Sequence, residues 1–206
     1  MSLKKLFFLS VSVCSLSNPC VTSAADLSVN GHIQPSGACS IALGNGGTVD
    51  LGTLSRKDLN ESDTKAIWRQ VKLAIDCQNP AKVAIKAINN RETLEFGDYG
   101  LGPTGSKNQS RYWFYLHNRY GDDKPLLYLR SLDGGQSWGA AEVGYSWIVT
   151  PSSLSAWAEK GETLPQAFRT IRSTLDFLIV LPAIRDLDLS QEIALDGSAT
   201  LELVYL

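Results

Sequence analysis

Apolar and polar residues alternate in several short segments of this chain, a pattern typical of half-buried β-strands. The alternation is clear at residues 27–33, 71–77 and 83–87, and it is most regular in the last segment, residues 199–206. Less regular apolar or aromatic segments lie at 112–116, 126–129, 143–149 and 175–181. The hydrophobic pattern therefore predicts short strands from one end of the chain to the other.

Turn-forming residues separate these segments. Gly-Asn-Gly-Gly occupies 44–47, Gln-Asn-Pro 78–80, Asp-Gly-Gly 133–135 and Asp-Gly-Ser 196–198. Helical periodicity is weak, and residues 154–160 and 166–172 fit a short turn or a loop equally well. Regularly spaced strands with turn chemistry between them favour an all-β, immunoglobulin-like β-sandwich built as a single domain.

The first 24 residues have the pattern of a secretory signal peptide. Lys4 and Lys5 precede an apolar stretch at 6–16, and small residues follow around Ala24 and Ala25. The apolar stretch is shorter than the roughly 20 residues that a membrane-spanning helix needs. We therefore expect export with cleavage after Ala24 or Ala25, a mature domain from residue 25 to 206, and residence in the periplasm or at the cell surface.

Cleavage would leave two cysteines, Cys39 and Cys77, because Cys14 and Cys20 lie in the removed segment. Two cysteines in an oxidising compartment are expected to pair. A crosslink that closes a loop of this length stabilises a fold by roughly 3–4 kcal/mol in the chain-entropy model. The expected fold thus carries one disulfide.

Composition and charge argue against several classes of function. The chain of 206 residues has a formal net charge of −2, which provides no basic surface for nucleic acid. Its two histidines, His32 and His117, are isolated, and its mature cysteines are assigned to the disulfide. We expect no metal site and no cofactor.

Residues 131–138, Ser-Leu-Asp-Gly-Gly-Gln-Ser-Trp, contain two motifs that suggest catalysis at first sight. The segment fits the Asp-box of sialidase-type propellers, and residues 135–139 fit the Gly-x-Ser-x-Gly elbow of hydrolases. A propeller needs several such blades, and the hydrolase fold needs a histidine after the nucleophile, whereas both histidines precede Ser137. We interpret the segment as a hairpin turn and expect no catalytic residues and no enzyme.

Several motifs together resemble the subunits of chaperone–usher fimbriae (pili). Val29 to Ile33 followed by Cys39 resembles the first strand of such a subunit, and residues 48–52, Thr-Val-Asp-Leu-Gly, resemble the segment that follows it. The C-terminal alternation with Tyr205 in the penultimate position resembles the fimbrial C-terminal motif. The whole mature chain also resembles a poorly characterised group of periplasmic, fimbria-related proteins.

This resemblance implies an incomplete sandwich with an open hydrophobic groove. In the family, a periplasmic chaperone fills the groove with one of its own strands, and a neighbouring subunit later replaces it by strand addition. Other fimbrial subunits are the further partners that the resemblance implies. The edge that a partner would meet here comprises Ala199, Leu201, Leu203, Tyr205 and Leu206.

Two observations leave alternatives open. The terminal strand would look the same if it completed an ordinary sandwich and met no partner. The residues between the cleavage site and Gly31 are also too few to fill a neighbour's groove, since each extended residue spans at most about 3.6 Å. The protein would then end an assembly or not polymerise.

Aromatic residues support a second hypothesis, a self-complete periplasmic or surface module that binds glycans. Tyr112, Trp113 and Tyr115 share one segment, and further tryptophans include Trp157. Trp113 and Trp157 are the candidate glycan-facing side chains. Packing of these aromatics in the core is the competing and preferred interpretation.

Overall fold

The computed structural model describes residues 38–93, 97–101, 110–144 and 147–206. The chain divides into two units, Met1–Ile33 and Gln34–Leu206, and every described residue belongs to the second. The predicted signal peptide and the alternating segment at 27–33 lie outside the described residues.

The described residues form strands and three short 3₁₀ helices, with no α-helix among them, which confirms the all-β prediction. The strands are β1 (Cys39–Leu43), β2 (Lys65–Asn89), β3 (Tyr99–Gly100), β4 (Arg111–Gly121), β5 (Lys124–Ser131), β6 (Gly139–Ala141), β7 (Leu154–Glu159), β8 (Ala167–Leu181) and β9 (Ala199–Tyr205). The 3₁₀ helices are η1 (Gly44–Gly47), η2 (Arg56–Asp58) and η3 (Ile184–Asp186).

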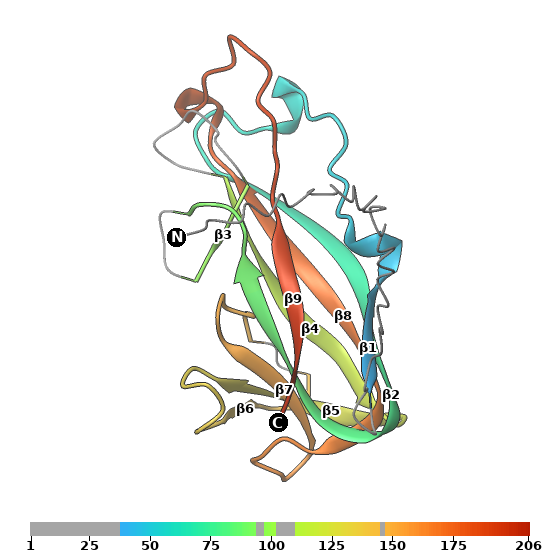
Figure 1. Cartoon of the computed structure of the whole chain (residues 1–206). Helices are drawn as coiled ribbons and strands as arrows, with labels where there is room; N and C mark the ends of the chain where they lie inside the picture. The colour runs from blue at the N-terminus through green and yellow to red at the C-terminus, as the bar shows by residue number, and fades with distance from the viewer. Residues whose placement is uncertain (1–37, 94–96, 102–109, 145–146) are drawn as a thin grey trace, which may run out of the picture. The chain divides into compact units, whose positions relative to one another are not determined.

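The long strand β2 takes part in two sheets (Figure 1). Its first half pairs with β1 on one side and with β8 on the other, and β8 continues through β4 to β3. Its second half pairs with β9 on one side and with β7 on the other, and β7 continues through β5 to β6. All of these pairings are antiparallel, so β2 joins two antiparallel sheets.

A second junction links the two sheets at the hairpin between β4 and β5, where Tyr120 pairs with Pro125. Hydrogen bonding therefore closes a ring of five strands in the order β4, β8, β2, β7 and β5, and β1, β3, β6 and β9 are added at its margins. An immunoglobulin-like sandwich does not require this closure, because its two sheets meet through side chains.

Local differences from the sequence-based expectation have physical causes. The predicted turn at 78–80 is a register irregularity inside β2, where three exposed residues including Pro80 lie between the segments that pair with β1 and with β9. Proline lacks the N–H that a central ladder requires, so the strand changes sheet at this point.

Three further segments also differ from expectation. Residues 154–160 and 166–172, left open between turn and loop, lie mainly in β7 and β8. The apolar segment at 143–149 was expected to be a strand, which was wrong. Its described residues contribute only an isolated bridge between Ile148 and Tyr115, since β6 ends at Ala141.

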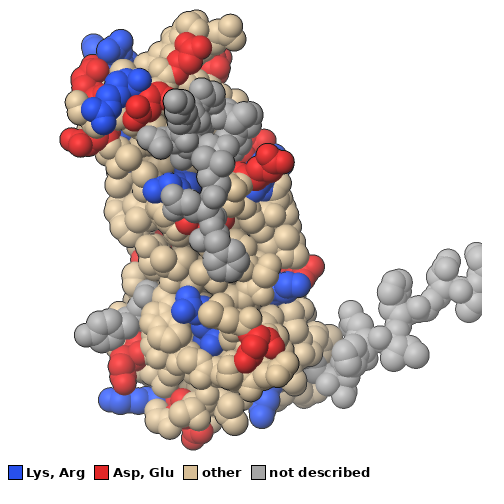
Figure 2. Space-filling model, turned by 90° about the vertical axis from the view of Figure 1, so that its left-hand side faces the viewer, with Lys and Arg blue, Asp and Glu red and all other residues tan. Residues whose placement is uncertain are grey.

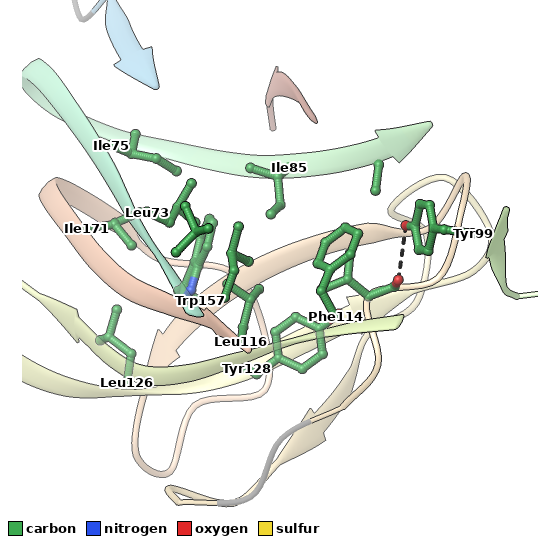
Figure 3. Packing of buried hydrophobic residues seen from close by; sticks show 14 of the residues in the cluster. Leu73, Ile75, Ile85, Tyr99, Phe114, Leu116, Leu126, Tyr128, Trp157 and Ile171 are labelled. Atoms are coloured by element: carbon green, nitrogen blue, oxygen red, sulfur yellow. Dashed lines mark hydrogen bonds between the residues drawn. The ribbon is translucent and has the colours of Figure 1, made fainter. Parts of the chain in front are cut away.

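The main core lies between the two sheets (Figure 3). Trp157, Tyr99, Tyr128 and Phe114 are among its largest fully buried side chains. The Tyr99 hydroxyl donates a hydrogen bond to the Val149 carbonyl at 3.0 Å, which is the dashed line in Figure 3. Buried tyrosines thus keep a partner for the polar end of the ring.

Candidate functional site

Strands β1 and β9 each have only one paired edge among the described strands. Both pair with β2, β1 near the middle of that strand and β9 near its end, and no described strand lies between them (Figure 1). A strand with one paired edge presents backbone N–H and C=O groups to whatever approaches its other edge. β1 and β9 therefore present open strand edges that belong to different sheets, as do the shorter strands β3 and β6 at the ends of the strand order.

The register shows which backbone groups of β9 point outward. Leu206 N–H donates to Lys82 O, and Asn90 N–H donates to Ser198 O, each at 3.0 Å. Opposed residues in an antiparallel pair alternate between hydrogen-bonded and non-hydrogen-bonded pairs. The outward-pointing backbone groups therefore belong to the alternate residues Ala199, Leu201, Leu203 and Tyr205.

The same argument applies to β1. Gln78 N–H donates to Ala38 O at 3.1 Å, so the outward backbone groups belong to Cys39, Ile41 and Leu43. The Cys39 N–H donates to the Tyr205 hydroxyl at 2.7 Å, which agrees with this assignment. The open edges of β1 and β9 thus meet at one end, where the penultimate tyrosine joins them.

A groove with a cavity volume of about 920 Å³ lies beside these edges. That volume would hold on the order of 30 water molecules at about 30 Å³ each, so it is much larger than a packing defect. Val71, Leu175, Phe177 and Ile179 line it from the sheet, and the segments 47–54 and 191–199 line it from the two sides. The groove is therefore bordered by core residues.

Apolar side chains along the groove are only half-buried. They pack against the main core without being covered themselves. Those that line the groove are Leu43, Val49, Leu51, Leu54, Leu195, Ala199 and Leu201, and Ile41 and Leu203 continue the stripe along β1 and β9. By contrast, Val71 and Leu175 beneath them are 4% and 1% exposed. This stripe of uncovered apolar surface follows the two open edges.

The turn before β9 is held close to the core. A Cβ on Gly197 would lie 2.7 Å from Leu101 Cδ2 and 2.9 Å from Tyr112 Cε1, so only glycine fits there. The neighbouring Asp196 carboxylate forms an ion pair with Arg91 at 2.5 Å. Sequence reasoning identified the Asp-Gly pair as a turn but not this close approach, which depends on residues from β4 and its surroundings.

The charged residues among the described lining of the groove are all acidic, namely Asp50, Glu192 and Asp196, and Asp196 is paired with Arg91. Burial raises the pKa of Tyr112, which lines the groove, so its phenol stays neutral at ordinary pH. On the face shown in Figure 2, basic and acidic side chains are interspersed and do not gather by sign. Most of the residues that line the groove are apolar, which suits an apolar occupant that bonds to backbone.

The predicted disulfide between Cys39 and Cys77 is confirmed. Its Cα atoms are 3.9 Å apart, closer than the usual range of about 4.4–6.8 Å. The two cysteines are directly opposed in a non-hydrogen-bonded pair, which is the closer type of antiparallel pair. The bridge fastens the start of β1 to β2, next to the contact between Cys39 and Tyr205.

The two candidate glycan-facing tryptophans occupy different environments. Trp157 is 1% exposed and lies in the core, so assigning it to a glycan surface was wrong. Trp113 is half-buried, its indole N–H donates to Asp98 Oδ1 at 2.7 Å, and the Arg111 guanidinium lies 5.3 Å from its ring. Arg111 therefore stacks on the Trp113 ring.

The motif at 131–138 is the turn between β5 and β6, as predicted. The Asp133 carboxylate accepts hydrogen bonds from the Ser131 hydroxyl at 2.7 Å and the Ser137 N–H at 2.9 Å. Hydrogen bonds from Ser137 above all hold the pKa of Asp133 well below its usual range. The Trp138 indole N–H donates a hydrogen bond to the Gly135 carbonyl, which closes the turn.

Within the described ranges, no group of three or more His, Cys, Asp or Glu side chains is arranged to hold a metal ion. The same residues include no helix long and apolar enough to cross a membrane.

One family model matches the chain. It is described as a protein of unknown function (DUF1120), and it matches residues 27–105, fewer than half of the chain. The matched region contains the two cysteines of the disulfide, β1, β2 and the segment 47–54 that lines the groove. No curated protein matches the chain.

Proposed function

We propose that this protein is an exported, fimbria-related structural or interaction protein whose groove between β1 and β9 takes up an extended strand from a partner. A periplasmic chaperone is the proposed first occupant, and other fimbrial subunits are the proposed later ones. The observation that carries this proposal is the pair of open strand edges beside a groove bordered by core side chains.

The geometry of the two edges supports insertion of a strand. β1 leads away from the contact between Cys39 and Tyr205, and β9 runs toward it, so the two edges are antiparallel to one another. A strand placed between them would be parallel to one edge and antiparallel to the other. It could bond to the outward backbone groups of both, as in recognition by strand addition.

The apolar stripe supports the same occupant. A partner strand places alternate side chains toward one face, at the spacing of the uncovered apolar residues of β9. Covering these residues would bury apolar surface at roughly 25 cal/mol per Å². In this proposal the fold is an immunoglobulin-like sandwich that lacks one strand between β1 and β9.

The proposal predicts a specific pattern of amide protection. The full chain is mixed with a synthetic peptide that alternates valine with threonine, and amide hydrogen exchange is followed by NMR. The amides of Leu201 and Leu203 should become protected, because they point away from β2 at the open edge of β9. Those of Thr200 and Glu202 should change little, because they already bond to β2.

A pair of variants in β9 tests the functional consequence. Leu201→Asp places a charge on the groove side and should abolish protection by the peptide and co-purification with a periplasmic chaperone. Glu202→Lys changes the charge on the opposite face and should leave both unchanged. Removing residues 203–206 should act like Leu201→Asp.

Loss of protein alone would not decide the matter, since either damaging change also harms a complete sandwich. The informative result is rescue, in which the wild-type chain refolds poorly alone and is recovered by the peptide or a chaperone. Cooperative, reversible refolding of the wild-type chain without any partner would contradict the proposal, as would unchanged exchange at Leu201 and Leu203.

A further inference from the structure

The face of the first sheet that points away from the groove carries an ordered set of aromatic and polar side chains. Three hydrogen-bonded strands, β2, β8 and β4, supply it, and their register places outward residues in rows. The successive rows are Trp68, Leu178 and Trp113, then Gln70, Asp176 and Tyr115, then Lys72, Thr174 and His117.

Two aromatic side chains of this face lean toward each other. Trp68 comes from β2 and Tyr115 from β4, with β8 between them, yet their ring centroids are 6.1 Å apart and their planes are tilted by 34°. Trp68 remains 55% exposed, more than any other tryptophan among the described residues. The pair forms an aromatic surface that is open to solvent.

A fixed polar cluster lies beside this surface. Asp176 is only 8% exposed, and its Oδ1 accepts a hydrogen bond from Gln70 Nε2 at 2.8 Å. Its Oδ2 is paired with Nδ1 of His117. A carboxylate oxygen has two lone pairs, so each Asp176 oxygen can accept a further bond. The imidazole presents Nε2 on the opposite side of its ring.

The occupant of this face must be recognised by side chains. β8 lies between β2 and β4 and is paired along both of its edges, so a ligand on this face meets side chains and not unpaired backbone groups of the central strand. The charges of the rows also balance, because Lys72 is basic and Asp176 acidic, and the Lys72 ammonium donates to Thr174 Oγ1 at 3.3 Å. A strongly acidic or basic ligand is therefore not favoured.

We propose that Trp68 and Tyr115, together with Gln70, Asp176 and His117, form a binding site for a neutral hexopyranose unit. The apolar C–H face of a pyranose ring stacks on an aromatic ring, and its hydroxyls bond to the neighbouring carboxylate, amide and imidazole. The site is independent of the groove, because Val71 and Leu175 point to the groove side of these strands while Gln70 and Asp176 point away from it.

Methyl β-D-glucopyranoside and methyl β-D-galactopyranoside are suitable probes, used with the full chain in saturation-transfer difference NMR. We expect the strongest transfer at ring C–H protons of at least one glycoside. Trp68→Ala should weaken binding about tenfold, the size expected for loss of one aromatic contact. Trp68→Phe should retain part of the affinity, and Gln70→Ala should weaken it.

Tyr120→Ala is the matched control, because Tyr120 is a 47% exposed aromatic residue on β4 that lies beyond the proposed site. It should leave binding unchanged, as should Leu201→Ala in the groove. Absence of transfer from both glycosides and of binding to an array of neutral oligosaccharides would overturn the proposal. Equal binding by Trp68→Ala would overturn it too. Self-association lost in Trp68→Ala without any sugar binding would assign this face to a second copy of the chain.

Discussion

β7 and β9 pair with the same half of β2, one on each side, and their burial is very different. Ala84 of β2 is opposite Ala156 of β7 and also opposite Val204 of β9. Five of the six residues of β7 are buried, whereas β9 has no buried residue. Two strands with the same central neighbour therefore contribute differently to the fold.

The difference comes from what lies beyond each strand. β7 pairs with β5 on its far edge, and both of its faces are covered. Trp157 enters the main core on one face, and Leu154, Ala156 and Ala158 form a small cluster under Trp138 on the other. β9, by contrast, pairs with no described strand on its far edge, and none of its residues is buried. Its far edge is therefore open to a partner strand.

The largest expected effect contrasts the two strands directly. Trp157→Ala should lower the free energy of unfolding by about 3–5 kcal/mol, because it leaves a large cavity in the core. Leu201→Ala in β9 should cost about 1–2 kcal/mol, because that side chain is only half-buried. Urea unfolding of both variants measures the contrast.

Equal costs for these two substitutions would show that β9 is as well covered as β7, and the comparison would fail. Trp157→Phe is the control. No described group accepts a hydrogen bond from the Trp157 indole N–H, so the smaller ring also removes a buried polar group without a partner. Its cost should be well below that of alanine.

The disulfide should come next in size. Replacing Cys39 and Cys77 together by serine should cost about 2–4 kcal/mol, because the unfolded chain loses a constraint and β1 loses its fastening to β2. β1 should loosen from β2 before β7 does, and amide exchange at Ala42, whose backbone bonds to β2, should report this. Identical denaturant midpoints for the variant and the oxidised parent would contradict a stabilising role.

Alkaline pH should destabilise the part of the core that lies beside β7. Burial raises the pKa of Tyr128, which packs in the core beside β7, to about 12. A raised pKa means that the folded state holds this proton more tightly than the unfolded state, whose tyrosines titrate near pH 10. The resulting stability is present below pH 10 and should be lost by about 2 kcal/mol as pH rises to 12.

Unfolding free energies measured from pH 9 to 12 would check this slope, and Tyr128→Phe should reduce it. A slope that is identical in the variant would mean that another group carries the effect. Burial raises the pKa of Tyr99 and Tyr112 in the same direction, so part of the slope should remain in the variant.

The smallest expected effect concerns the turn that covers the outer face of β7. The pKa of Asp133 is depressed by hydrogen bonds from Ser137, so this turn is stabilised while the carboxylate is charged. That contribution is present above pH 4 and should be lost as pH falls through the lower folded pKa. Asp133→Asn should loosen Trp138 at neutral pH, and the Trp138 indole N–H signal in NMR should report it. An unchanged signal would mean that packing alone holds the turn.

The sequence pattern by itself determined the strand class, one terminal strand, one hairpin turn and one disulfide. Alternation in β9, the all-β class, the hairpin at 131–138 and the pairing of Cys39 with Cys77 follow from local periodicity, turn residues and cysteine count. These features depend on neighbours in the chain or on a single pairing, which is why a sequence can specify them.

The tertiary structure alone decided which strands were covered. β7 was not recognised, because a strand buried on both faces does not alternate, and its small residues Ser155, Ala156 and Ala158 give no strong signal. β9 alternates clearly, yet its pattern is the same whether a partner, a further strand or water lies beyond it. Its open edge, the groove beside it and the row of Trp68, Leu178 and Trp113 on the opposite face arise from the register of strands distant in sequence, which no local pattern encodes.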